Sequence, residues 1–170
     1  NKNDHRGAGR RKNRASAWMD LGVALFRLCQ AVRVNRGWNG KDKGKGQSDK
    51  GQEDNEYAGS YGNLIRETRS ALKNAILFSS ANGDGQRTAD ESVSADLAVN
   101  AADAWNALGV VETEMAFPPR PLVAQYAFIR AMYLSNGNHA QAWSNLGYLY
   151  LKCGFSRRAL AAFCLLYTSP

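Results

Sequence analysis

Histidines and cysteines are the side chains best suited to catalysis or metal binding, and their spacing in this sequence supports neither. His5 and His139 lie far apart, and His139 is interpreted as a solvated residue at a turn. Cys29 and Cys153 do not take part in the C-x2-C or H-x3-H spacings of a zinc site. No G-x-S-x-G element and no carboxylate pair on one helix face is present. We therefore expect no catalytic residue, no metal and no cofactor, and a protein that is not an enzyme.

Two glycine-containing segments resemble phosphate-binding loops only superficially. Residues 40–45 read GKDKGK, which is one residue short of a P-loop, and Gly46 stands where Ser or Thr is required. Residues 83–85 read GDG and lack the third glycine of a dinucleotide fingerprint. No strand is expected before either segment, so both are interpreted as loops.

Composition limits the class of protein further. The 170 residues carry a net charge of +7, which favours acidic partners electrostatically. Three cysteines are an odd number and indicate a reducing compartment rather than a disulfide framework. No apolar run approaches the roughly 20 residues that span a bilayer. We expect a soluble protein of the cytoplasm, with the nucleus as the alternative, and no membrane contact.

The elements that would position any site are helices, and residues 141–163 show this most clearly. One apolar face is formed at i, i+3, i+4 and i+7 by Trp143, Leu146, Gly147 and Tyr150. Gly154 breaks the pattern, and a second apolar face begins with Ala159 and Phe163. This is the tetratricopeptide pattern W-x2-L-G-x2-Y followed by A-x3-F, in which the small residues let two helices approach closely.

The same signature recurs earlier in the chain. Its first helices carry Trp18, Leu21, Gly22 and Leu25, and then Trp105, Leu108 and Gly109. Its second helices carry Thr68, Leu72 and Ala75, and then Ala124, Phe128 and Ala131. Glu112 stands where the pattern has Tyr, which predicts loose packing or exposure at that position. We therefore predict an all-α protein with about three tetratricopeptide helix–turn–helix repeats forming an α-solenoid.

The repeats divide the chain into segments. Residues 1–14 are basic without interleaved aromatics and are predicted to be disordered. The first repeat spans 15–80 with a disordered insertion at about 35–60, because that stretch is too polar to form a core. A loop at 81–94 precedes the second repeat at 95–137, and a truncated third repeat spans 138–163. Residues 164–170 resemble a frame of the transposase adapter used in sequencing libraries, so we expect an artefact there and a fragment overall.

The first helices of such repeats line a concave groove, and side chains between the signature positions face the ligand. The candidate groove residues are Met19, Val23, Asn106, Val110, Ser144, Asn145 and Tyr148. This mixture suits an extended peptide or a helix better than a phosphate. Chaperone-binding modules of the family use Lys and Asn to clamp a carboxylate, and only Asn145 loosely resembles such a residue. The alternative for all these positions is ordinary packing between repeats or exposure to solvent.

Residues 100–163 resemble a more specific family. The stretches WNALGVV (105–111), AQYAFIR (124–130) and AWSNLGYLYL (142–151) are similar to the large tetratricopeptide scaffold of the superkiller (Ski) complex. The resemblance implies a cytoplasmic scaffold that joins an RNA helicase and WD40 subunits and feeds RNA to the exosome for 3′-to-5′ mRNA decay. Contact with RNA would be indirect. That family's scaffold supplies no catalytic residue to carry over.

Two other functions stay open. The chain is alternatively a generic adaptor that binds peptides in a chaperone or trafficking complex, or a regulatory repeat region of a larger enzyme. A carboxylate clamp in a further repeat would favour the adaptor, whereas an attached catalytic domain would favour the enzyme.

Overall fold

The computed structural model describes residues 2–35, 51–80, 91–116 and 118–168, with side chains described for 13–34, 59–79, 99–116 and 118–166. These residues form helices and no strand, as the spacing of the apolar residues predicted. The helices are α1 (Lys2–Asn35), α2 (Gly51–Ser80), α3 (Glu91–Val110), α4 (Pro121–Leu134), α5 (Ala140–Lys152) and α6 (Ser156–Thr168). A π-helical turn, η1 (Val111–Met115), extends α3. The all-α prediction is confirmed.

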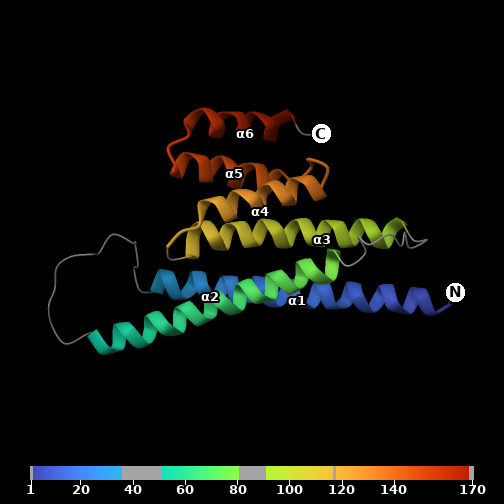
Figure 1. Cartoon of the computed structure of the whole chain (residues 1–170), viewed down its shortest axis with the longest axis horizontal. Coiled ribbons are helices and arrows are strands. Elements are labelled where there is room, and N and C mark those ends of the chain that lie inside the picture. Colours follow the sequence, from blue (N-terminus) through green and yellow to red (C-terminus); the bar gives the residue numbers. More distant parts are fainter. Residues whose placement is uncertain (1, 36–50, 81–90, 117, 169–170) are drawn as a thin grey trace.

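The helices stack in chain order. α1 packs on α2, α3 on α4 and α5 on α6, and each pair also contacts the next through α2–α3 and α4–α5. Figure 1 shows the result as a layered stack that rises from the long α1 and α2 to the short α6. Packing between sequential neighbours is compatible with an α-solenoid.

A glycine in the first helix of each pair permits close approach of the second helix. A Cβ atom built on Gly109 would lie 2.5 Å from Cε1 of Phe128, and one on Gly147 would lie 2.5 Å from Cε1 of Phe163. The equivalent distance from Gly22 to Cδ2 of Leu72 is 2.8 Å. Because real Cβ contacts are longer than this, each second helix is seated where only glycine leaves room.

Burial follows the predicted signature with one exception. The buried signature residues are Gly22, Thr68, Leu72, Ala75, Leu108, Gly109, Ala124, Phe128, Ala131, Leu146, Gly147 and Ala159. The half-buried ones are Trp18, Leu25, Trp105, Trp143, Tyr150 and Phe163. Leu21 is 44% exposed, whereas the equivalent Leu108 and Leu146 are 5% and 4% exposed.

Two apolar clusters form the core. The first joins α1, α2, α3 and η1, and the second joins α4 and α5. Trp105 packs against both clusters. Its ring also meets the Tyr126 ring edge to face, with 5.6 Å between the two ring centroids. A single half-buried tryptophan therefore connects the two parts of the core.

The turns match their sequence signals. Pro121 lies in the first turn of α4, where its missing N–H costs nothing. Gly137 has φ +87 and Gly154 has φ +78, the left-handed conformation that ends a helix and that glycine adopts without strain. The Gly137 N–H donates to the carbonyl of Met132 at 2.8 Å, which satisfies a carbonyl at the end of α4.

Three predicted boundaries are wrong. Residues 2–14, expected to be disordered, belong to α1, and residues 51–60 of the expected insertion belong to α2. Residues 91–94 of the expected loop open α3. Once a helix has nucleated, each further residue adds one hydrogen bond that roughly offsets the entropy of ordering that residue, so helices can extend beyond their buried part. The rest of the predicted loops, 36–50 and 81–90, lies outside the described residues. α6 also continues past Phe163 to Thr168.

Candidate functional site

The candidate groove helices are neighbours in the structure. α1 contacts α3, and α3 contacts α5, so the three first helices lie in sequence along the stack. Residues on these helices can therefore share one face, although they come from distant parts of the chain. The predicted groove residues lie on these three helices, and they differ in how accessible their side chains are to a ligand.

The structure brings the two amides of the predicted groove together. The side-chain Nδ2 of Asn145 in α5 donates to Oδ1 of Asn106 in α3 at 2.9 Å. Both side chains are half-buried. An amide keeps unused donors and acceptors after one such bond. The pair thus joins two helices and still offers hydrogen-bonding capacity to a peptide backbone.

Tyr148 is the most accessible of the predicted groove residues, with 49% of its surface exposed. The ammonium of Lys152, one turn further along α5, lies 5.3 Å from the centre of the Tyr148 ring. An aromatic ring beside a cation can bind an apolar group and an acidic group at once. The sequence interpretation included Tyr148 and missed Lys152.

The remaining groove residues are less available. Met19 packs against the first core cluster, and Val110 packs against the second. Val23 and Ser144 are half-buried. For Met19 and Val110 the alternative of ordinary packing therefore accounts for the side chain.

Glu112 is the largest departure from expectation. Its side chain is 3% exposed, so the predicted looseness or exposure at this position is wrong. Arg69 of α2 donates through Nε to Oε1 at 2.6 Å and through a second nitrogen to Oε2 at 2.9 Å. A two-point guanidinium–carboxylate contact satisfies both carboxylate oxygens, which is the condition for burying the charge. The pair fastens the first helix pair to the second.

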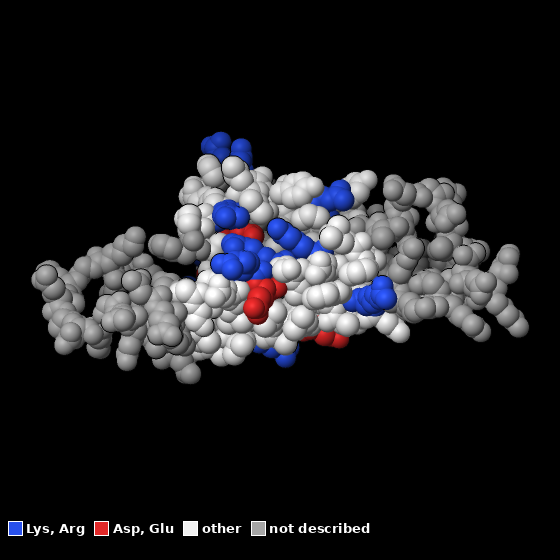
Figure 2. Space-filling model, turned by 60° about the horizontal axis from the view of Figure 1, so that its bottom comes forward, with Lys and Arg blue, Asp and Glu red and all other residues white. Residues whose placement is uncertain are grey.

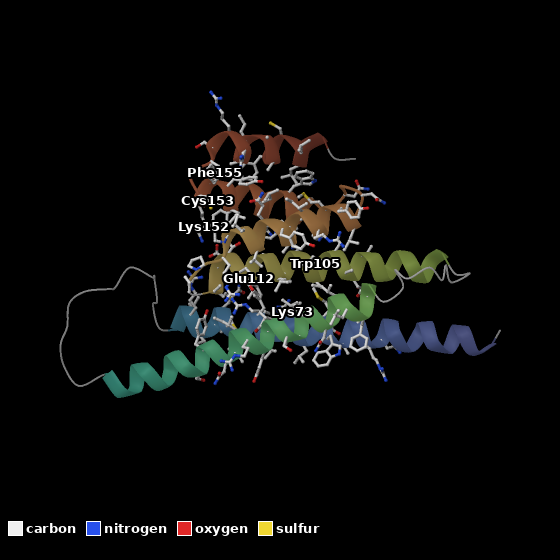
Figure 3. The ribbon with its side chains drawn as sticks, viewed as in Figure 1. Lys73, Trp105, Glu112, Lys152, Cys153 and Phe155 are labelled. Carbon is white, nitrogen blue, oxygen red and sulfur yellow. The ribbon has the colours of Figure 1, made fainter. Side chains whose placement is uncertain are left out.

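Glu114, two residues later, bridges the other helices. Arg33 of α1 donates to the Glu114 backbone carbonyl at 2.7 Å, and its guanidinium lies 3.5 Å from Oε2. Lys152 of α5 donates to Oε1 at 2.8 Å. Figure 3 shows Lys152 and Glu112 at the same end of the stacked helices, and Figure 2 shows basic side chains beside acidic ones in the middle of one face.

The π-helical turn contains both carboxylates. The Ala116 N–H donates to the Val111 carbonyl at 3.0 Å, which closes the wider π ring. The hydroxyl of Thr113 donates to the Gly109 carbonyl at 2.8 Å. This network was not predicted. The available signal was the acidic residue at a tyrosine position, and its partner Arg69 belongs to a different helix pair.

A buried thiol and a buried phenol lie in the first core. The Cys29 sulfur is 3.7 Å from Oγ1 of Thr68, and burial raises the pKa of the thiol above its ordinary value of 9.0. Burial likewise raises the pKa of Tyr61 above its ordinary value of 10.0. A negative charge on Cys29, when that thiol ionises, would raise the Tyr61 pKa further, whereas the positive charge of Arg33 lowers it. Both groups are therefore neutral at physiological pH, which suits packing rather than nucleophilic chemistry.

His139 caps a helix instead of projecting into solvent. Its Nδ1 accepts from the Ala142 N–H at 3.2 Å, and its Nε2 lies 3.1 Å from a carboxylate oxygen of Asp103. The His139 side chain is 12% exposed. The interpretation as a solvated turn residue is therefore wrong, because the start of α5 packs beside α3.

The described part of the chain contains neither a metal-binding cluster nor a helix suited to crossing a membrane. Within it, no three His, Cys, Asp or Glu side chains form a group able to hold a metal ion. None of the helices described there combines the length and apolar character that crossing a membrane requires.

No protein-family model, no curated protein and no solved structure matches the chain at a significant level.

Proposed function

We propose that this chain is a non-catalytic scaffold of the tetratricopeptide class, which binds other proteins along α1, α3 and α5. One observation carries the proposal. In each of the three successive helix pairs, a glycine of the first helix receives a large side chain of the second, through Gly22–Leu72, Gly109–Phe128 and Gly147–Phe163. Stacked pairs of this kind form extended surfaces suited to long ligands.

The side chains on the candidate face support an extended peptide or a helix as the ligand. Asn106 and Asn145 offer amide donors and acceptors, and Tyr148 with Lys152 offers an aromatic ring beside a cation. Backbone hydrogen bonds to the two amides and an apolar contact with Tyr148 would suit a peptide partner, whereas an acidic side chain would share Lys152 with Glu114, which already pairs with it at 2.8 Å. The net charge of +7 would speed association with an acidic partner.

The sequence resemblance gives the proposal a cellular setting. The stretches 105–111, 124–130 and 142–151 favour a scaffold of cytoplasmic RNA surveillance, with an RNA helicase and WD40 subunits as partners. In this role the chain holds proteins together for exosome-linked mRNA decay and touches RNA only indirectly.

Affinity purification from a cell extract tests the proposal. The tagged chain should enrich an RNA helicase and a WD40 protein, identified by mass spectrometry. Tyr148→Ala should reduce this enrichment at least about fivefold, since an anchoring tyrosine at an interface often contributes more than 1 kcal/mol. Tyr133→Ala is the matched control, because Tyr133 is 72% exposed on α4, away from the candidate face.

Other outcomes discriminate between functions. Recovery of a chaperone through its C-terminal peptide would identify a chaperone adaptor instead. Recovery of both expected partners with unchanged yield from Tyr148→Ala would show that a different surface binds them.

A further inference from the structure

The solvent-facing side of α4 carries a row of large apolar side chains. The members of this row lie four, three and four residues apart, which places them in line along about three turns of the helix. We name this surface the α4 stripe, and it consists of Leu122, Tyr126, Ile129 and Tyr133. Each of these residues is between 43% and 79% exposed.

The place of α4 in the stack shows that this exposure does not arise from an end of the chain. α4 packs against α3 on one side and against α5 on the other. Figure 1 shows α4 in the middle of the stack, with helices both below and above it. In an α-solenoid each helix pair contacts only its neighbours, so further pairs at either end would not cover α4.

α2 supplies an internal comparison for the stripe. Leu72 of α2 and Phe128 of α4 occupy the same position, because each packs on the glycine of its own first helix. Counted from these two residues, the positions of Leu122, Tyr126, Ile129 and Tyr133 are taken in α2 by Arg66, Ser70, Lys73 and Leu77. These α2 positions are exposed as well, and most of them are polar. Packing within the stack therefore does not require apolar side chains on this face.

The make-up of the α4 stripe is that of a protein-binding surface. Contiguous large apolar side chains that face solvent mark interaction sites, and tyrosines are frequent anchors at protein interfaces. The distance along the helix from Leu122 to Tyr133 is roughly 17 Å at a rise of 1.5 Å per residue. A partner helix of about three turns, with apolar residues along one side, would match this length.

The charges around the stripe indicate which polar groups the partner carries. Residues 115–170 contain no Asp or Glu. The cations of this region are Arg120, Arg130, Lys152, Arg157 and Arg158. Among the described residues, only Lys152 of these five pairs with a carboxylate. The surroundings of the stripe are therefore complementary to an acidic partner.

Arg130 lies beside the stripe. The carbon of its guanidinium is 5.5 Å from the centre of the Tyr133 ring. Its Nε is buried and has no hydrogen-bond partner among the described residues. A carboxylate from outside would give this half-buried cation the partner that the described chain does not supply.

We propose that the α4 stripe binds an acidic amphipathic helix of another protein. The apolar side of that helix covers the stripe, and its carboxylates lie toward Arg130. A second copy of this chain is a poorer occupant, because α4 contains no carboxylate and two copies would bring like charges together. The stripe lies on α4, apart from the groove along α1, α3 and α5, so the proposal is independent of the partner in the groove.

Fluorescence anisotropy with a labelled synthetic peptide and the full chain tests the proposal. The probe is a helical peptide of about 18 residues, which is long enough to run past the stripe at both ends. Its leucines repeat at spacings of three and four residues, and glutamates flank them. The wild-type chain should bind this peptide, and a peptide with glutamine in place of each glutamate should bind at least about threefold more weakly.

Ile129→Lys is the decisive variant, because it adds a positive charge while it removes an apolar contact. Binding of the acidic peptide should weaken at least about tenfold. The fold should persist by circular dichroism, since α2 carries Lys73 at the same position. Arg130→Gln should weaken binding about threefold and reduce its dependence on salt.

Two control variants should bind the peptide at least as tightly as the wild type does. Ser70→Lys adds the same charge to an exposed position of α2, at the equivalent of Tyr126. Tyr148→Ala alters the candidate groove and leaves α4 intact.

Four results would overturn the proposal. Absence of peptide binding by the wild-type chain would show that the stripe does not accept an acidic helix. Unchanged or tighter binding by Ile129→Lys would show that charge alone holds the peptide. Loss of binding in Tyr148→Ala would place the peptide in the groove. Tighter binding of single-stranded RNA or of phosphatidylserine vesicles than of the peptide, with loss in Ile129→Lys, would assign the stripe to a nucleic acid or to a membrane surface.

Discussion

Replacing Arg69 by methionine should destabilise the protein by about 2–4 kcal/mol, because Glu112 would be left charged, buried and without its partner. The Glu112 side chain is 3% exposed, so water cannot replace the two lost hydrogen bonds without opening the contact between α2 and η1. Removing one partner of a fully buried pair costs about 3–5 kcal/mol. We expect somewhat less here, since Arg69 itself is 21% exposed and some water already reaches the pair.

The double variant Arg69→Met/Glu112→Leu should recover most of this loss and lie within about 1 kcal/mol of the wild type. Replacing a buried ion pair by apolar side chains of similar size is often neutral, because the desolvation penalty of both charges disappears. The Leu25 that stands at the equivalent position of α1 indicates that a leucine suits this helix face.

Urea unfolding followed by circular dichroism measures all three free energies. Arg66→Met is the matched control, because Arg66 is an exposed arginine of the same helix, and its replacement should cost less than about 0.5 kcal/mol. The reasoning fails if Arg69→Met costs no more than this control. It also fails if the double variant is less stable than Arg69→Met alone.

Other changes follow from the same packing. Gly109→Ala should cost about 1–3 kcal/mol in the same urea assay, because the new methyl group would overpack against Phe128. Gly62→Ala should instead stabilise α2 by about 0.5–1 kcal/mol, because open space surrounds its methyl group. Equal effects of the two changes would contradict the close approach of α3 and α4. Above pH 9.0 the unfolded chain loses the Cys29 proton while the folded chain keeps it, so the unfolded state binds fewer protons and the free energy of unfolding falls as pH rises. Cys29→Ala should reduce this fall, measured by urea unfolding at several alkaline pH values. An unchanged dependence of the unfolding free energy on pH would refute this role of Cys29. His139→Ala should lower the free energy of unfolding by about 1 kcal/mol, because the side chain that caps the start of α5 is lost. Thermal unfolding measures this loss, and an unchanged stability would show that water replaces the cap.

The sequence predicted the parts of the fold that depend on one helix pair. The i, i+3, i+4 and i+7 spacing around Trp143 identified the buried face of α5, and the small residues predicted a close approach of two helices, which the structure shows where Phe163 lies against Gly147. These predictions succeed because both partners of each contact belong to one local motif.

Predictions failed where the partner lies in another pair. The environment of Glu112 is decided by Arg69, and nothing near Glu112 in the sequence reveals that arginine. His139 was misplaced for the same reason, because Asp103 comes from α3. Met19 and Val110 were placed on the groove by their spacing, but helical spacing does not show which neighbouring element covers a flank.

The contacts of Glu114 also have a mechanical consequence. Glu114 forms ion pairs with Arg33 of α1 and with Lys152 of α5, so it links the first and third layers. The Arg33 and Lys152 side chains are 37% and 42% exposed. Salt therefore weakens these two ion pairs far more than it weakens the buried Arg69–Glu112 pair. The link between the first and third layers therefore weakens as ionic strength rises, while the junction between the first two layers is little affected.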